Sequence, residues 1–152
     1  MSTRGEALDL DRQICFPLYA ATRAVTQRYA QVLADVGLTY PQYLVMLALW
    51  TDGPMSVGDL GRRLRLDSGT LTPLLKRLEA SGRVERRRDP ADERRVVVSP
   101  TADGLRLRED VSEVPGEVAS SLGLTINEFM TLHHLLTDVI ANLDRLATPV
   151  KP

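Results

Sequence analysis

The sequence predicts a mainly α-helical fold in which two short helices and a β-hairpin lie between longer helices at both ends of the chain. Three observations predict it. Apolar residues recur every three or four positions near both ends, which is the period of an amphipathic helix. In the middle, two short helical segments are separated by only three residues, Arg65 to Asp67. An arginine- and valine-rich segment then follows over residues 83–99, and its β-branched residues favour strands.

Composition places the chain among soluble globular proteins. Its 152 residues are 43% hydrophobic and 26% charged, which suits one domain over residues 1–152. No apolar run approaches the ~20 residues that span a bilayer, and the first residues lack the apolar core of a signal peptide. The single cysteine excludes an internal disulfide. We therefore expect a cytoplasmic protein.

The net charge of −1 conceals an uneven distribution along the chain. Residues 56–99 hold 11 Lys/Arg against 7 Asp/Glu, a balance of +4, and the remainder holds 8 against 13, a balance of −5. A basic middle between acidic ends indicates a surface for a polyanion, carried on helices that do not contact it. An asymmetry of this size also arises by chance, so other features of the sequence must identify the polyanion.

The first helix is predicted over about 14–36. Its apolar residues are three or four positions apart, and Gly37 ends it. Pro17 fits only the first turn of a helix, where its missing N–H is not needed, and this places Cys15 at the helix N-terminus. A second helix is predicted over Gln42 to Trp50, opened by Thr39-Tyr40-Pro41.

The two short helices form a predicted helix-turn-helix. The first spans Val57 to Leu64, and the second begins near Asp67 and ends at Ser81-Gly82, with a bend expected at Pro73. An apolar stripe of leucines marks the buried face of the second helix. Its other face carries hydroxyls and cations, which suit contacts with base edges and phosphates, although an ordinary amphipathic surface helix is the alternative. The residues predicted to contact DNA on this face are Ser68, Thr70, Thr72, Lys76 and Arg77.

A hairpin directly after such a helix is a wing. Strands are predicted over residues 83–88 and 95–99, joined by a Pro-containing loop, 89–94, that is longer than the tightest turns. Arg94 near the tip suits a DNA minor groove, which attracts arginine electrostatically; a solvated loop is the alternative. The predicted DNA-binding part is therefore about 56–99.

Two C-terminal helices complete the prediction. One is expected from Leu105 to about Leu122 with a break at Pro115-Gly116, and the other runs over 126–147. These two and the first helix present more apolar surface than a small winged helix covers, and a two-fold dimer buries such a surface. The predicted dimerisation helices are about 14–36 and 101–147.

Together these features resemble the MarR family of dimeric winged-helix regulators. The wing residues Asp92-Glu-Arg94 and Ser99-Pro-Thr101 match the family's wing motif, apart from Pro100, where an aliphatic residue is usual. Three further stretches resemble its peroxide-sensing branch, the organic hydroperoxide resistance regulators. They are Ile14-Cys-Phe-Pro-Leu-Tyr19, Leu38-Thr-Tyr-Pro-Gln-Tyr43 and Leu66-Asp-Ser-Gly-Thr-Leu-Thr-Pro73.

This resemblance implies a repressor that binds an inverted-repeat operator as a homodimer and releases it when organic hydroperoxides oxidise Cys15. The tyrosines that contact the sulfur from the partner subunit match Tyr29 and Tyr40. With one cysteine per chain, a small cellular thiol is expected to form a mixed disulfide with the oxidised sulfur. The resemblance implies no cofactor and no enzymatic activity.

The residues themselves leave alternatives open. A helix N-terminus favours the reactive thiolate, but a lone cysteine beside an apolar face is otherwise a small buried hydrophobe. One rival is a MarR-type repressor released by a phenolic or other apolar ligand, with Cys15 incidental. A thiol peroxidase is disfavoured because the chain has no resolving cysteine. Metal binding is not expected, because the adjacent His133 and His134 point to different helix faces.

Overall fold

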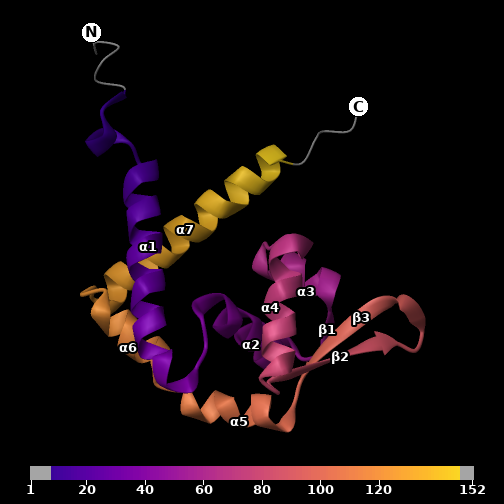
Figure 1. Ribbon diagram of the computed structural model, residues 1–152. Helices are drawn as coiled ribbons and strands as arrows, with labels where there is room; N and C mark the ends of the chain where they lie inside the picture. The colour runs from indigo at the N-terminus through magenta and orange to yellow at the C-terminus, as the bar shows by residue number, and fades with distance from the viewer. Residues whose placement is uncertain (1–7, 148–152) are drawn as a thin grey trace, which may run out of the picture. The chain divides into compact units, whose positions relative to one another are not determined.

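The computed structural model describes residues 8–147, which fall into two compact units, one ending at Val114 and one beginning at Pro115 (Figure 1). The mainly α-helical winged-helix fold predicted from the sequence is confirmed, because the described residues are mainly helical and their strands form one small antiparallel sheet. None of the helices described between residues 8 and 147 is both long and apolar enough to span a bilayer.

The first long helix, α1 (Cys15–Val32), follows a short 3₁₀ helix, η2 (Leu10–Arg12). Pro17 therefore lies in the first turn of α1, as its missing N–H requires. The predicted extension to Val36 was wrong: the chain tightens into a second 3₁₀ helix, η3 (Ala34–Val36), and turns at Gly37 with φ 65°. The left-handed conformation that Gly37 adopts costs glycine little.

The second helix, α2 (Tyr40–Asp52), supplies much of the core of the first unit. Thr39 caps it: its hydroxyl accepts the Gln42 N–H, and the Gln42 side chain accepts the Thr39 N–H in return. The helix is longer than the predicted 42–50 because Pro41 is accommodated in its first turn. Its buried hydrophobic residues are Tyr43, Val45, Met46, Ala48 and Leu49.

The helix-turn-helix is formed by α3 (Val57–Leu64) and α4 (Ser68–Ala80), as predicted. Between them Arg65 adopts φ 57°, and the Leu66 N–H donates to the Gly61 carbonyl at 2.9 Å. Asp67 caps α4 by accepting the Thr70 N–H at 2.8 Å. The helix continues through Pro73. The leucine stripe is buried as predicted; its members are Leu71, Leu74, Leu75 and Leu78.

The wing consists of β2 (Val84–Asp89) and β3 (Asp92–Pro100), and a short strand that the sequence did not reveal, β1 (Met55–Ser56), pairs with the far side of β3. The predicted six-residue loop was wrong, because the strands extend until only Pro90 and Ala91 remain between them. A register shift after Arg88 lets Asp89 pair with Asp92. The Arg88 guanidinium also donates to the Glu93 carbonyl at 3.1 Å, which closes the hairpin.

The chain after the wing forms α5 (Ala102–Asp110) and α6 (Val114–Ser121). The break predicted at Pro115-Gly116 was misplaced: it falls at 111–113, and Pro115 lies in the first turn of α6, where proline is tolerated. Gly104 brings α5 against the base of the wing. A Cβ on Gly104 would overlap the Arg83 carbonyl oxygen and lie 3.2 Å from the Met46 Cε.

The last helix, α7 (Ile126–Ala147), has the predicted bounds. The Glu128 carboxylate accepts both the Thr125 N–H and the Thr125 hydroxyl at 2.8 Å, which fixes the start of the helix. Its apolar side chains remain exposed in the single chain; they include Phe129, Leu132, Leu136, Val139, Ile140 and Leu143.

Candidate nucleic-acid interface and thiol site

The outer face of α4 presents the polar residues that the sequence singled out. Ser68, Thr70, Lys76 and Arg77 are exposed, and Thr72 is half-buried. The Thr70 hydroxyl donates to the Asp67 carboxylate at 3.2 Å, so its oxygen lone pairs remain available as acceptors. The hydrogen bond from the Thr70 N–H holds the pKa of Asp67 below its usual range, so the cap is charged at neutral pH.

A groove of about 610 Å³ lies between the start of α3, the middle of α4 and the wing. Two predicted contact residues, Thr72 and Arg94, line it together. Thr70 and Arg77 instead line a hollow of about 190 Å³ against the start of α2. Sequence reasoning missed the other arginines that line the groove, which are Arg62, Arg86 and Arg95. Only the packing of the wing on α3 and α4 brings them together.

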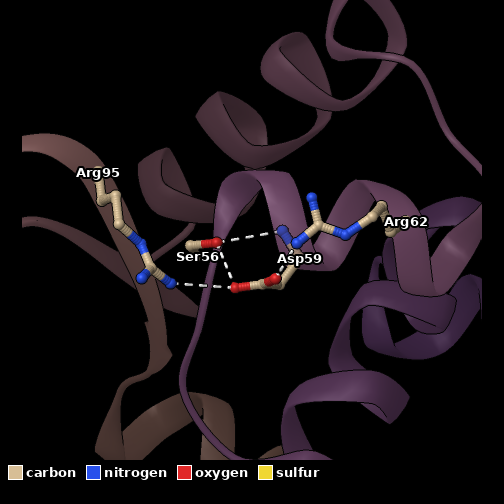
Figure 2. Close-up of polar contacts among 4 residues, drawn as sticks. All are labelled: Ser56, Asp59, Arg62 and Arg95. Atoms are coloured by element: carbon tan, nitrogen blue, oxygen red, sulfur yellow. Dashed lines mark hydrogen bonds and ion pairs between the residues drawn. The ribbon is translucent and has the colours of Figure 1, made fainter.

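Four arginines of the described chain line the groove, and three of them donate hydrogen bonds to carboxylates. Arg86 donates to Glu79 on α4 through two nitrogens, at 3.0 and 2.5 Å, and this hydrogen bonding lowers the pKa of Glu79. Arg62 and Arg95 both donate to Asp59, and the Ser56 hydroxyl donates to the same carboxylate at 2.5 Å (Figure 2). The Ser56 hydrogen bond, followed by the charges of the two arginines, lowers the pKa of Asp59.

Arg94 differs from the other groove arginines. Its side chain is 94% exposed, and its nearest carboxylate, that of Asp92, lies 3.6 Å from its Nε. The Asp92 side chain also accepts the Arg94 backbone N–H at 3.1 Å, which fixes the backbone while the guanidinium remains in solvent. An exposed arginine near the tip of a hairpin suits insertion into a narrow anionic groove.

Cys15 is exposed at the first position of α1. The first N–H groups of a helix have no intrahelical acceptor, so the site favours an anion. Tyr29 lies 14 residues further along the same helix, a distance of about 21 Å at ~1.5 Å per residue. The two predicted partners of the sulfur, Tyr29 and Tyr40, therefore do not meet Cys15 within one chain.

The two tyrosines do meet each other. Their rings stack with centroids 4.4 Å apart, and the Tyr43 ring lies 5.7 Å from that of Tyr29. Burial raises the pKa of Tyr29 and of Tyr40, and that of Tyr43 to about 12. All three phenols are therefore protonated at neutral pH, the form of the hydroxyl that can donate a hydrogen bond. The sequence resemblance found the pair; the stacking of α1 on α2 was visible only in the structure.

Metal ligation has no support in the part of the chain that the structure describes. Among residues 8–147 no group of three His, Cys, Asp or Glu side chains is placed to hold an ion. The rings of His133 and His134 lie edge to face with centroids 6.1 Å apart on the surface of α7.

Comparisons with known proteins agree with this architecture. Residues 38–96, from α2 into the wing, match the profile of the MarR family. The organic hydroperoxide resistance transcriptional regulator of Bacillus subtilis is 40% identical over 146 residues, which cover 96% of this chain and 97% of that protein. The regulator TtmR of Methylorubrum extorquens is 50% identical over 82% of this chain; the match spans 64% of TtmR, slightly less than two thirds of its length.

Solved structures of transcriptional regulators are also similar to this chain. The reduced form of AbfR from Staphylococcus epidermidis, bound to DNA, superposes with a TM-score of 0.80 at 36% identity. The match covers 94% of this chain and 98% of that one. Full-length similarity at these identities, together with the helix-turn-helix and wing described above, shows that the chain belongs to the MarR family of transcriptional regulators.

Proposed function

We propose that this protein is a peroxide-sensing repressor, which binds an inverted-repeat operator as a homodimer and releases it when organic hydroperoxides oxidise Cys15. The observation that carries the proposal is an exposed Cys15 at the first position of α1, in a chain similar to an organic hydroperoxide resistance regulator over nearly its whole length. The proposed site of action is the cytoplasm, where thiols are kept reduced.

The DNA-binding part of the proposal rests on α4 and the wing. With α4 in a major groove, Thr70 and Thr72 reach base edges near its N-terminal half, and Ser68, Lys76 and Arg77 reach phosphates. The exposed side chain of Arg94 then enters the adjacent minor groove. AbfR, a relative of similar fold, has been solved bound to DNA.

The sensing part requires two subunits. Because about 21 Å of helix separates Cys15 from Tyr29 of its own chain, the phenols that contact the sulfur come from the partner. A homodimer buries the apolar side chains left exposed on α1 and α7, which include Phe16, Leu18, Leu136 and Leu143. Two copies of α4 about one DNA turn apart, ~34 Å, then read an inverted repeat.

The proposed chemistry is stoichiometric. The Cys15 thiolate attacks the hydroperoxide oxygen, so a sulfur–oxygen bond forms, the O–O bond breaks and an alcohol leaves, giving a sulfenic acid. A small thiol then displaces water from that sulfur and leaves a mixed disulfide. Since the chain has no second cysteine, it lacks an internal resolving thiol, and we propose a regulator without catalytic turnover or cofactor.

Release from DNA follows from the size of the mixed disulfide. The added group lies beside the stacked phenols of Tyr29 and Tyr40, where a packed interface resists extra volume. Moving α1 and α2 changes the spacing of the two recognition helices, and operator affinity depends on that spacing.

A gel-shift assay with wild-type protein and Cys15→Ser tests the proposal. Both proteins should bind an operator selected from random duplexes, because the thiol is needed for release and not for binding. Cumene hydroperoxide with a small thiol should release the wild type only. A serine variant that still dissociates would instead favour the ligand-released repressor or oxidation elsewhere in the chain.

A further inference from the structure

We propose that Asp59 is a positioning residue that sets the DNA selectivity of this protein, by tying the wing to the helix-turn-helix and holding two groove arginines away from non-specific phosphates. The inference rests on the proposed DNA binding and adds a residue to which the sequence assigned no role in DNA binding.

The geometry makes Asp59 a link between two elements. It is the third residue of α3; its Oδ2 accepts the Ser56 hydroxyl at 2.5 Å and the Arg95 guanidinium of β3 at 3.2 Å. Its Oδ1 accepts Arg62 from the next turn of α3 (Figure 2). One carboxylate thus connects the start of α3, its second turn and the wing.

The surroundings show why a carboxylate here affects selectivity more than folding. The Asp59 and Arg95 side chains are 41% and 52% exposed, and ion pairs this accessible add little to stability. Among the described residues that line the groove, however, Asp59 is the acidic one, facing four arginines. It therefore offsets positive charge in the groove between α4 and the wing, the two elements proposed to contact DNA.

The ion pairs that Asp59 forms with Arg95 and Arg62 have different effects on the affinity for operator DNA and on the affinity for non-specific DNA. Non-specific binding depends almost entirely on phosphate neutralisation, so it weakens when two arginines are held by a carboxylate. Operator binding requires Arg94 in the minor groove while α4 contacts bases in the major groove, so it benefits from a fixed distance between the wing and α4. Asp59 thus weakens binding to non-specific DNA and preserves the preference for the operator.

The test compares Asp59→Asn with Asp89→Asn, which removes the same charge from the wing turn. Asparagine at 59 leaves the Ser56 cap of α3 in place, because the Ser56 hydroxyl accepts the backbone N–H of residue 59 at 3.1 Å. The Asp89 carboxylate accepts the Ala91 N–H at 2.9 Å, which an asparagine oxygen also does. Dissociation constants are measured for the selected operator and for a scrambled duplex of equal length.

We expect Asp59→Asn to bind scrambled DNA several-fold more tightly, with a salt slope steeper by about one, while the operator-to-scrambled preference falls on the order of tenfold. Asp89→Asn should raise both affinities together and keep the preference. Arg95→Gln should lower the operator-to-scrambled preference by a similar factor. The double variant Asp59→Asn/Arg95→Gln should lower that preference no more than either single variant does. Equal loss of both affinities in Asp59→Asn, or an unchanged preference, would overturn the proposal.

Hydrogen exchange of the DNA-free protein separates this inference from the proposed function. Amides of residues 84–100 should exchange several-fold faster in Asp59→Asn than in wild type or Asp89→Asn, because the wing has lost its link to α3. If the wild type shows no operator preference, the proposed function fails. The amide exchange rates of residues 84–100 then still test whether Asp59 ties the wing to α3. Unchanged exchange in Asp59→Asn would contradict the link itself.

Discussion

The side chains on the outer face of α4 fall into two chemical groups, and each group predicts a different response of DNA binding to mutation. Lys76 and Arg77 offer charge without directional matching to a base, whereas Thr70 and Thr72 offer short hydroxyls close to the helix N-terminus. The first group is expected to determine how strongly DNA binds, and the second which sequence binds.

Neutralising a phosphate contact should therefore act on all sequences alike. Arg77→Gln is expected to weaken operator and scrambled DNA by similar factors and to reduce the salt slope by about one. Thr72→Val, which keeps the shape of the half-buried side chain, should instead change the ranking of operator variants. Binding titrations at several salt concentrations check both, and a sequence-selective loss in Arg77→Gln would contradict its assignment to phosphate.

Arg94→Ala should weaken operator binding and leave folding unchanged, because the side chain is 94% exposed. Removal of a minor-groove arginine is expected to cost about 1–3 kcal/mol of binding free energy, measured by anisotropy. Thermal unfolding of the same variant provides the control. If Arg94→Ala binds its operator like wild type, the assignment of Arg94 to the minor groove is wrong.

Residues whose role depends on their own position in a helix were predictable from sequence, and residues whose role depends on tertiary contacts were not. The exposed face of α4 follows from its leucine period. The carboxylate partner of Arg95 does not, because 36 residues separate Arg95 from Asp59, and the pairing of β1 with β3 is one of the tertiary contacts that bring α3 and the wing together. For this reason the groove arginines other than Arg94 were missed.

Among the elements, α5 depends most visibly on one residue. Gly104 lies where a Cβ would overlap the Arg83 carbonyl, and the Gly104 carbonyl accepts the Trp50 indole N–H at 2.9 Å. Gly104→Ala must therefore displace α5 from the base of the wing or from α2. We expect a loss of about 1–3 kcal/mol in the free energy of unfolding, measured by urea denaturation at fixed protein concentration.

Gly116→Ala is the matched control. Nothing lies within 4 Å of a Cβ at Gly116, which is inside α6. Because alanine favours a helix by about 0.5–1 kcal/mol over glycine, this variant should be as stable as wild type or more stable. Equal destabilisation by the two substitutions would show that the close approach at Gly104 does not limit stability.

Element starts were easier to predict than element ends. Thr39, Ser56, Asp67, Thr101 and Thr125 mark helix starts through short-range capping, which a sequence encodes locally. The wing turn and the break after α5 were misplaced for the opposite reason. The register shift after Arg88 depends on how the two strands pair, and the turn after Asp110 carries the buried side chain of Val111, so neither is set by helix capping.

At the scale of the whole molecule, the exposed apolar residues of α1 and α7 predict association. Light scattering should give a dimer at micromolar concentration, because the large apolar side chains exposed on each of these helices are unfavourable in water. Leu143→Glu, on the apolar face of α7, should shift the protein towards monomer. Asp138→Lys, on the polar face, should remain dimeric. A wild-type monomer would contradict both the dimer and the inverted-repeat operator.

The central claim, that modification of Cys15 causes release, is tested most directly by measuring both events in the same samples. Operator-bound wild type is titrated with substoichiometric cumene hydroperoxide in the presence of a small thiol. Anisotropy gives the fraction of DNA released, and intact mass with peptide mapping gives the fraction of chains carrying the mixed disulfide at Cys15. The account predicts that the two fractions rise together and that dithiothreitol reverses both. Release while Cys15 remains a thiol, or full modification of Cys15 with the operator still bound, would contradict it.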